Sequence, residues 1–244
     1  MTKFNKIERG DIVQIAERFL WEEEAKSARD YLLQDRCLSE DVLRSFHVGF
    51  LPDDLNHKLR GRIILPLYDA SGNLICINSR AIREENDGLP KYWHETYEKS
   101  LYLYGLNIAK HEMRRCRFAI VVEGQIDVLQ LHKHGAKNAI AICGSTLSYT
   151  QYSMILRYCE EIVLILDNDE NKAGQRATSK IASAISKFSE GVESGSFVAL
   201  EYKMISLELK SAKDPDEFVK KFGFEALKYS IRNKLMELRS RNDY

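Results

Sequence analysis

Acidic side chains follow two strongly apolar segments of the chain, at the point where each segment ends. Glu123 comes directly after the apolar run 118–122, and Asp167 and Asp169 open the stretch after the run 162–166. Carboxylates that lie together without basic partners repel one another, and a divalent cation relieves that repulsion. Oxygen ligands of this kind suit Mg²⁺ or Mn²⁺. If the three acids share one pocket, they predict metal-assisted phosphoryl chemistry.

The elements that must position these acids are buried strands. The runs 118–122, 139–143 and 162–166 are continuously apolar, and each is followed by residues typical of a helix. Strands that are apolar on both faces and joined by helix-length connections predict a parallel sheet covered on both sides. The ligand crevice of such a sheet lies beyond the carboxyl ends of its strands, so we expect the acids to meet there.

Each acid, taken singly, has a simpler interpretation as a turn or helix-capping residue. Their occurrence at the ends of successive runs, with a further acidic pair at Asp214 and Asp216, is what favours the metal site.

The first part of the chain has a different pattern. Residues 11–33 carry apolar side chains at spacings of three and four, which predicts an amphipathic helix interrupted near Ser27, and a short helix follows Ser39. Two β-type runs, 62–68 and 74–80, flank a turn and predict a hairpin. The segment 55–83 carries local positive charge, because it has one acid, Asp69, and five basic residues: Lys58, Arg60, Arg62, Arg80 and Arg83. A solvated hairpin face is the simpler interpretation.

Changes of hydrophobic period set the expected domain limits, with the main boundary near Cys116. We expect residues 1–116 to form a basic α+β subdomain, residues 117–203 an α/β catalytic domain with a mainly parallel sheet, and residues 204–244 an acidic motif with a helical segment.

Composition excludes several classes of protein. Thirty-six Lys and Arg offset 36 Asp and Glu, so no global field draws the chain onto a polyanion. The five cysteines are scattered and never spaced as CxxC, which excludes a zinc ribbon and argues against a disulfide framework. No apolar run suits a membrane span or a secretory signal, so we expect no membrane association and a cytoplasmic protein. His132 and His134 are expected on a helix surface.

Two motifs carry a family resemblance. VEGQID (122–127) and LDND (166–169), with Gly174 after them, resemble the signatures of the Toprim domain shared by bacterial primases, topoisomerases and some nucleases. Further motifs resemble, in order, the catalytic core of DnaG-type replicative primases: ARDYL (28–32), DRCLS (35–39), FHVGF (46–50), RIILPL (62–67), PKY (90–92), LYGL (103–106) and KDPDE (213–217). The resemblance covers about residues 28–222.

The resemblance implies roles for individual residues. The catalytic acids would be Glu123, Asp127, Asp167 and Asp169. The metal ligands would be Glu123, Asp167, Asp169, Asp214 and Asp216. The residues that hold the template or the nucleotide would be Arg36, Arg62, Arg80, Lys91, Tyr92 and Lys99.

The activity implied is that of a DNA primase, a DNA-directed RNA polymerase that makes short RNA primers from ribonucleoside triphosphates on single-stranded DNA by nucleotidyl transfer with Mg²⁺ or Mn²⁺. A Toprim-type metal-dependent nuclease has the same acids, although the primase-like motifs before residue 107 argue against it. A non-catalytic protein that binds single-stranded nucleic acid is the alternative outside the enzymes.

Two modules of such primases have no counterpart in this sequence. The zinc-binding module would precede the core, but residues 1–27 hold no Cys or His, so no zinc is expected. After the motif at 213–217 there is room for about one helix, over 224–241, and none for a helicase-binding domain. We therefore expect a stand-alone core that works with a replicative helicase or a zinc-domain protein in trans. A phage or mobile-element replication protein in a bacterial cell fits this pattern.

Overall fold

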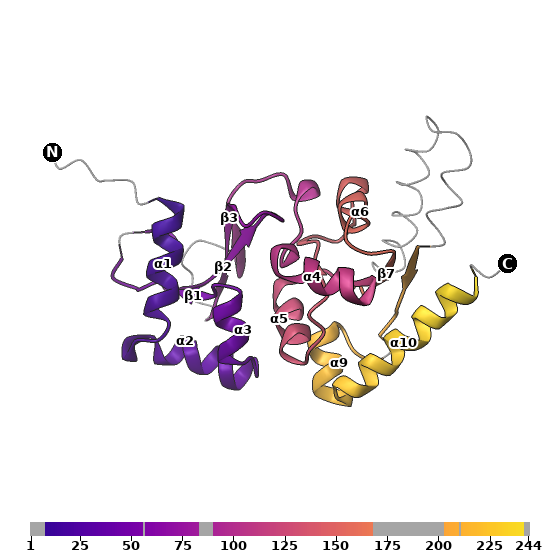
Figure 1. The fold of residues 1–244 in the computed structure, drawn as a ribbon. Coiled ribbons are helices and arrows are strands. Elements are labelled where there is room, and N and C mark those ends of the chain that lie inside the picture. The colour runs from indigo at the N-terminus through magenta and orange to yellow at the C-terminus, as the bar shows by residue number, and fades with distance from the viewer. Residues whose placement is uncertain (1–7, 56, 83–89, 168–202, 210, 242–244) are drawn as a thin grey trace. The chain divides into compact units, whose positions relative to one another are not determined.

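The computed structural model describes residues 8–55, 57–82, 90–167, 203–209 and 211–241 (Figure 1). The chain divides into two compact units, Met1–Tyr97 and Glu98–Tyr244. The boundary between these units lies at residues 97 and 98, before the helix Leu106–Cys116. The predicted domain limits, 1–116, 117–203 and 204–244, stay predictions.

The first unit places a group of short helices beside an antiparallel sheet. Its helical elements are α1 (Arg9–Phe19), the 3₁₀ turn η1 (Glu23–Ala25), α2 (Lys26–Asp30), the π turn η2 (Tyr31–Asp35) and α3 (Glu40–Ser45). Its described strands are β1 (Gly49–Phe50), β2 (Arg62–Tyr68), β3 (Leu74–Ala81) and β4 (Tyr92–His94), in the order β1-β2-β3-β4. The predicted hairpin is confirmed as β2 and β3, with Asp69 Oδ1 accepting the Ser71 and Asn73 backbone N–H groups in the turn.

The helix expected over residues 11–33 breaks earlier than predicted. The break lies between α1 and η1, not at Ser27. Arg29 explains the position, because its guanidinium donates to the carbonyl oxygens of Leu20 at 3.0 Å and of Glu22 at 2.7 Å. The Arg29 side chain thus supplies a donor to carbonyls at the point where the helix is interrupted, and the Glu22 carbonyl oxygen also accepts the backbone N–H of Ala25 at 3.3 Å.

The core of the first unit lies between α1 and the sheet. Ile12, Val13 and Ala16 of α1 pack with Ile64 of β2 and other buried apolar residues. Gly49 of β1 allows the closest approach, since a Cβ there would lie 2.3 Å from the backbone of α1 at Ala16.

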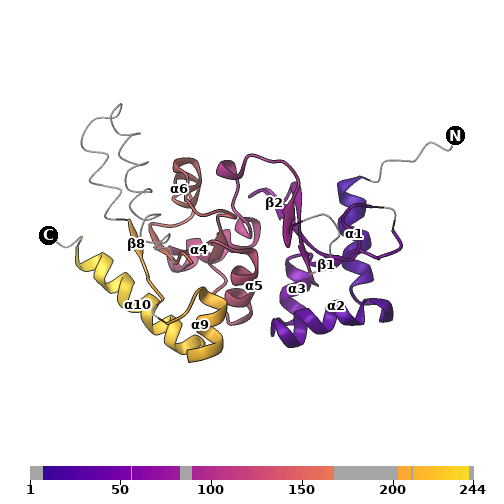
Figure 2. The same cartoon turned by 180° about the vertical axis from the view of Figure 1, so that it is seen from behind.

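The second unit is an α/β fold around a parallel sheet, as predicted. Its described strands are β5 (Phe118–Val122), β6 (Ala139–Ala141), β7 (Glu161–Leu164) and β8 (Met204–Ser206), in the order β6-β5-β7-β8 with every pair parallel. Its described helical elements are η3 (Lys99–Leu101), α4 (Leu106–Cys116), α5 (Gln125–Lys133), α6 (Tyr149–Ile155), α9 (Pro215–Phe222) and α10 (Phe224–Ser240). The expected C-terminal helix is α10, which runs beside β8 (Figure 2).

The expectation that His132 lies on the surface is wrong. His132 is 5% exposed, and its Nε2–H donates to the carbonyl oxygen of Ala139 at 2.9 Å. Burial lowers the pKa of this histidine to about 4. His134 is half-buried and stacks on Phe224 with ring centroids 5.1 Å apart. Across the described ranges, no helix has the length and apolar character needed to cross a membrane.

Candidate active site

Glu123 and Asp167 lie together at the carboxyl ends of two neighbouring strands. β5 and β7 pair in parallel, with Val121 opposite Leu164. Glu123 follows β5, and its carboxylate Oε1 accepts the backbone N–H of Asp167 at 3.0 Å. The carbonyl oxygen of Glu123 accepts the N–H of Cys143, which follows β6, at 3.1 Å. Glu123 therefore joins the ends of three strands, where the sequence pattern predicted that the acids would meet. Asp169 and Gly174 lie outside the described residues.

Asp127 lies in the first turn of α5 and is buried. Its Oδ1 accepts the N–H of Asp216 at 3.2 Å. Burial raises the pKa of Asp127 well above its ordinary value, and the negative charges of Asp214 and Asp167 raise it further. Gly124 makes room for this carboxylate, because a Cβ at residue 124 would lie 2.7 Å from Asp127 Oδ2. The acids from two distant motifs therefore act on one another electrostatically.

Asp214 and Asp216 open α9 and have structural partners. The Asp214 carboxylate caps the helix by accepting the N–H of Glu217 at 2.8 Å. Asp216 is 6% exposed, accepts a hydrogen bond from Gln130 Nε2 at 2.9 Å, and pairs with Lys220 Nζ at 3.1 Å. Their role as metal ligands stays a prediction.

Gln130 is a residue of this site that the sequence reasoning missed. It is 3% exposed on α5 and ties α5 to Asp216 of α9. The available signal was a polar residue one turn after Asp127 in an otherwise apolar helix segment.

The chemistry of these donors fits a hard divalent cation. Glu123, Asp127 and Asp167 are oxygen donors, and the pKa of Asp127 is raised first by burial and then by the negative charges of Asp214 and Asp167. Among the described residues, however, no three such side chains are arranged to hold a metal ion, and Asp169 lies outside them. Glu123 and Asp167 are the described residues best placed to hold one at the strand ends.

Two of the residues predicted to hold template or nucleotide, Arg36 and Arg80, contact one tyrosine in the first unit, and a third, Tyr92, contacts Arg80. The Tyr31 ring lies 5.6 Å from the Arg36 guanidinium carbon and 5.7 Å from that of Arg80. Arg36 Nε also donates to the Tyr31 hydroxyl at 2.8 Å, and Arg80 lies 4.6 Å from the ring centre of Tyr92, which is 46% exposed. We call Tyr31, Arg36, Arg80 and Tyr92 the cation–aromatic cluster. Tyr31 is the member that the sequence reasoning did not single out as functional.

Arg62 and Arg80 are not the solvated hairpin face of the simpler interpretation, because they are 1% and 4% exposed. The Arg62 guanidinium donates to Ser79 Oγ at 3.0 Å and to the carbonyl oxygens of Pro90 at 2.6 Å and Lys91 at 3.0 Å. These bonds fix the segment that carries the side chains of residues 91 and 92. The binding role of Arg62 stays a prediction, and its contacts are structural.

The remaining two predicted binding residues have less defined surroundings. The Lys91 side chain is exposed in the first unit. Lys99 begins η3 of the second unit, where its carbonyl oxygen accepts a hydrogen bond from Gln151 Nε2 at 2.9 Å.

Sequence comparison supports the family resemblance. Residues 120–219 match a Toprim-like family. The DNA primase of Synechocystis sp. is 29% identical over 237 residues, which cover 82% of this chain and 36% of that protein. The chain thus spans about a third of the length of the curated relative.

Comparison with solved structures shows the fold. The match to a structure of the DnaG catalytic core covers 92% of this chain and 78% of the matched chain, with a TM-score of 0.77 and 24% sequence identity. The match to a DnaG primase catalytic domain bound to single-stranded DNA covers 92% of this chain and 79% of the matched chain, with a TM-score of 0.74 and 23% sequence identity. The predicted fold class and the resemblance to this family are confirmed.

Proposed function

Because the chain has a DnaG-type primase core, we propose that it synthesises short RNA primers from ribonucleoside triphosphates on single-stranded DNA. The observation that carries the proposal is the hydrogen bond between the Glu123 carboxylate and the Asp167 N–H at the ends of β5 and β7. It sets two acids side by side at the edge where an open parallel sheet binds ligands.

The second unit would supply the chemistry. Mg²⁺ or Mn²⁺ held by Glu123, Asp167 and Asp169 would activate the attacking 3′-hydroxyl and stabilise charge on the transferred phosphate. Asp127 would act mainly as a support, because its Oδ1 accepts the N–H of Asp216 and so holds the start of α9 against α5. Asp214 and Asp216 would hold α9 against α5, with metal binding as a second role.

The first unit would supply template contacts. The half-buried guanidinium of Arg36, held on the Tyr31 ring, would contact phosphates without reading bases, and the buried Arg80 would hold the exposed ring of Tyr92, which offers a surface for stacking. Lys91 would add a mobile positive charge beside it, and Lys99 would contact nucleotide or template from the second unit. A replicative helicase or a zinc-domain protein would direct the enzyme to its start sites in a bacterial cytoplasm.

The test is incorporation of labelled ribonucleotides on circular single-stranded DNA without a primer, in Mg²⁺ and in Mn²⁺. Asp167→Asn and Asp169→Ala are compared with the wild type, and Glu225→Gln, an exposed acid on α10, is the matched control. We expect metal-dependent short RNAs from the wild type and the control, and none from the two site variants.

Two other outcomes would replace the proposal. Metal-dependent cutting of the circle, lost in the same variants, would identify a nuclease. Binding of the circle with neither synthesis nor cutting, even with helicase and zinc-domain proteins added, would identify a binding protein.

A further inference from the structure

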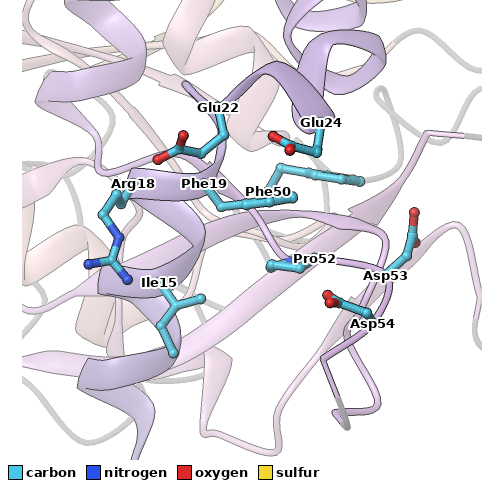
Figure 3. A pocket seen from close by; sticks show the side chains of 9 residues that line it. All are labelled: Ile15, Arg18, Phe19, Glu22, Glu24, Phe50, Pro52, Asp53 and Asp54. Atoms are coloured by element: carbon cyan, nitrogen blue, oxygen red, sulfur yellow. The ribbon is translucent and has the colours of Figure 1, made fainter.

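A pocket of about 830 Å³ opens in the first unit (Figure 3). None of the residues that line it belongs to the cation–aromatic cluster. The walls of the pocket come from α1, from the segment that joins α1 to η1 and η1 itself, and from β1 and the stretch after it. The function proposed above uses none of the residues that line it.

The floor of the pocket is a pair of aromatic rings. Phe19 and Phe50 stack with centroids 6.2 Å apart and planes 17° apart. Phe50 is 6% exposed and anchored in the core, whereas Phe19 is half-buried. Stacked rings anchored in this way offer an apolar surface whose faces also attract cations.

The rim of the pocket is acidic. Glu22 and Glu24 stand on one side of the stacked rings, and Asp53 and Asp54 stand on the other (Figure 3). All four are exposed, and within the described part of the chain none of them forms an ion pair with a basic side chain. Arg18 is the basic residue among those that line the pocket. Four carboxylates against one guanidinium give the pocket a negative field.

One of these acids lies against a glycine. Gly61 has a positive φ of 68°, which favours glycine, and a Cβ there would lie 2.2 Å from Asp53 Oδ1. The absence of a side chain at residue 61 leaves space for the Asp53 carboxylate beside the backbone.

The charge of the pocket decides between classes of occupant. Phosphates of a nucleic acid would meet four carboxylates, so a template strand or a nucleotide is repelled. A basic polypeptide gains from the same field, and an apolar side chain beside its charge can cover the rings. Charge complementarity and the aromatic floor together select a peptide that carries both features.

We propose that this pocket docks a basic segment of a partner protein, with a leucine-like or aromatic side chain on Phe19 and Phe50 and an arginine or lysine between the carboxylates of the rim. The site is independent of primer synthesis, so the two proposals succeed or fail separately.

The test measures binding of a fluorescein-labelled peptide, Arg-Leu-Arg-Leu-Arg, to the full chain by fluorescence anisotropy at about 0.15 M salt, where the Debye length is about 8 Å. Glu24→Gln combined with Asp54→Asn removes two rim charges, and Glu40→Gln combined with Asp41→Asn is the matched control, two exposed acids of α3 outside the pocket. We expect about five-fold weaker binding for the rim variant and no change for the control.

Further comparisons make the result specific. Phe19→Leu, which is milder than a change at the buried Phe50, should weaken binding about three-fold by loss of the ring face. Replacing the leucines of the peptide by glycine should weaken peptide binding as well, and labelled oligothymidine should bind the rim variant no more weakly than it binds the control variant. Circular dichroism melting curves check that each variant is folded.

The proposal is overturned if the wild type fails to bind the peptide, or if rim and control variants weaken binding alike. Full displacement by free arginine amide, with leucine making no difference, would mean a site for a small amine. Weaker binding of labelled oligothymidine to the rim variant than to the control variant would mean a nucleic-acid surface.

Discussion

The acidic edge of the second unit and the cation–aromatic cluster of the first unit hold their charges by opposite means. At the acidic edge, backbone N–H groups and strand ends fix the carboxylates, and Asp127 lies buried among other acids. In the cluster, side-chain rings carry the guanidinium groups of Arg36 and Arg80. A carboxylate held by backbone N–H groups is fixed by the fold, whereas the half-buried Arg36, held on the Tyr31 ring, can reorient toward a ligand while the buried Arg80 supports the exposed Tyr92 ring. The first arrangement suits chemistry and the second suits binding of a variable strand.

The largest effect is expected at the acidic edge. Glu123→Gln keeps the shape of the side chain and removes its charge, so primer synthesis should fall about 1,000-fold while affinity for single-stranded DNA stays the same. Incorporation of labelled nucleotides measures primer synthesis, and fluorescence anisotropy of a labelled oligonucleotide measures the affinity for single-stranded DNA. Equal loss of both would contradict the division of labour between the units.

The next effect concerns Arg62, which is hydrogen-bonded to the backbone of the segment that carries Tyr92. Arg62→Ala removes a buried guanidinium with three described acceptors, so the free energy of unfolding should fall by about 3 kcal/mol. Urea unfolding measures it, with Arg60→Ala, at an exposed position, as the control that should change it by less than about 0.5 kcal/mol. A small effect at Arg62, with a large loss of DNA affinity, would move Arg62 into the group of ligand-binding residues.

A smaller effect follows from the buried histidine of the second unit. The folded state holds the pKa of His132 at about 4, against 6.5 for an ordinary histidine, so the unfolded chain takes up the proton first as pH falls. The contribution of neutral His132 to the free energy of unfolding is fully present above pH 6.5 and is lost between pH 6.5 and 4. At pH 5 the loss is about 2 kcal/mol. The raised pKa of Asp127 acts in the opposite direction, so the informative quantity is the difference between wild type and His132→Gln.

Urea unfolding at pH 7.5 and pH 5 gives that difference. The variant should lose less stability than the wild type on acidification. Equal losses in the two proteins would show that His132 takes up its proton in the folded state too.

The smallest effect tests the cluster itself. Tyr31→Leu removes the ring that both Arg36 and Arg80 contact, so affinity for single-stranded DNA should fall about ten-fold. Tyr31→Phe keeps the ring, loses the bond to Arg36 Nε, and should cost about three-fold. Trp21→Leu is the control, since Arg44 lies 4.1 Å from the Trp21 ring centre outside the cluster. Equal losses for Tyr31→Leu and Trp21→Leu would show a general loss of stability.

Local pattern was enough to predict the strands β2, β3, β5, β6 and β7 and the meeting of the first two acids, whereas the short strands β1, β4 and β8 were not predicted. The run 118–122 became β5 with the same limits, because a continuously apolar segment is buried on both faces wherever it pairs. Glu123 and Asp167 then met because parallel strands end at the same edge. Their catalytic roles, and those of the other site residues, stay predictions.

Features that depend on a distant partner could not be predicted from pattern. The break after α1 depends on the reach of Arg29, the burial of His132 depends on the carbonyl of Ala139, and the part played by Tyr31 depends on Arg80. In each case the residue type fits an exposed position equally well. Only the packed fold supplies the contact that decides its position.

The hydrogen bond from Asp216 N–H to Asp127 spans 89 residues of sequence. Closing so long a loop is entropically demanding, and contacts of high sequence separation slow folding. Asp127, Gln130 and Asp216 can therefore come together only after α9 has left the ribosome and docked on α5. A nascent chain that has already formed β5, β6 and β7 still lacks the support behind its carboxylates, and the acidic edge matures as one of the last events of folding.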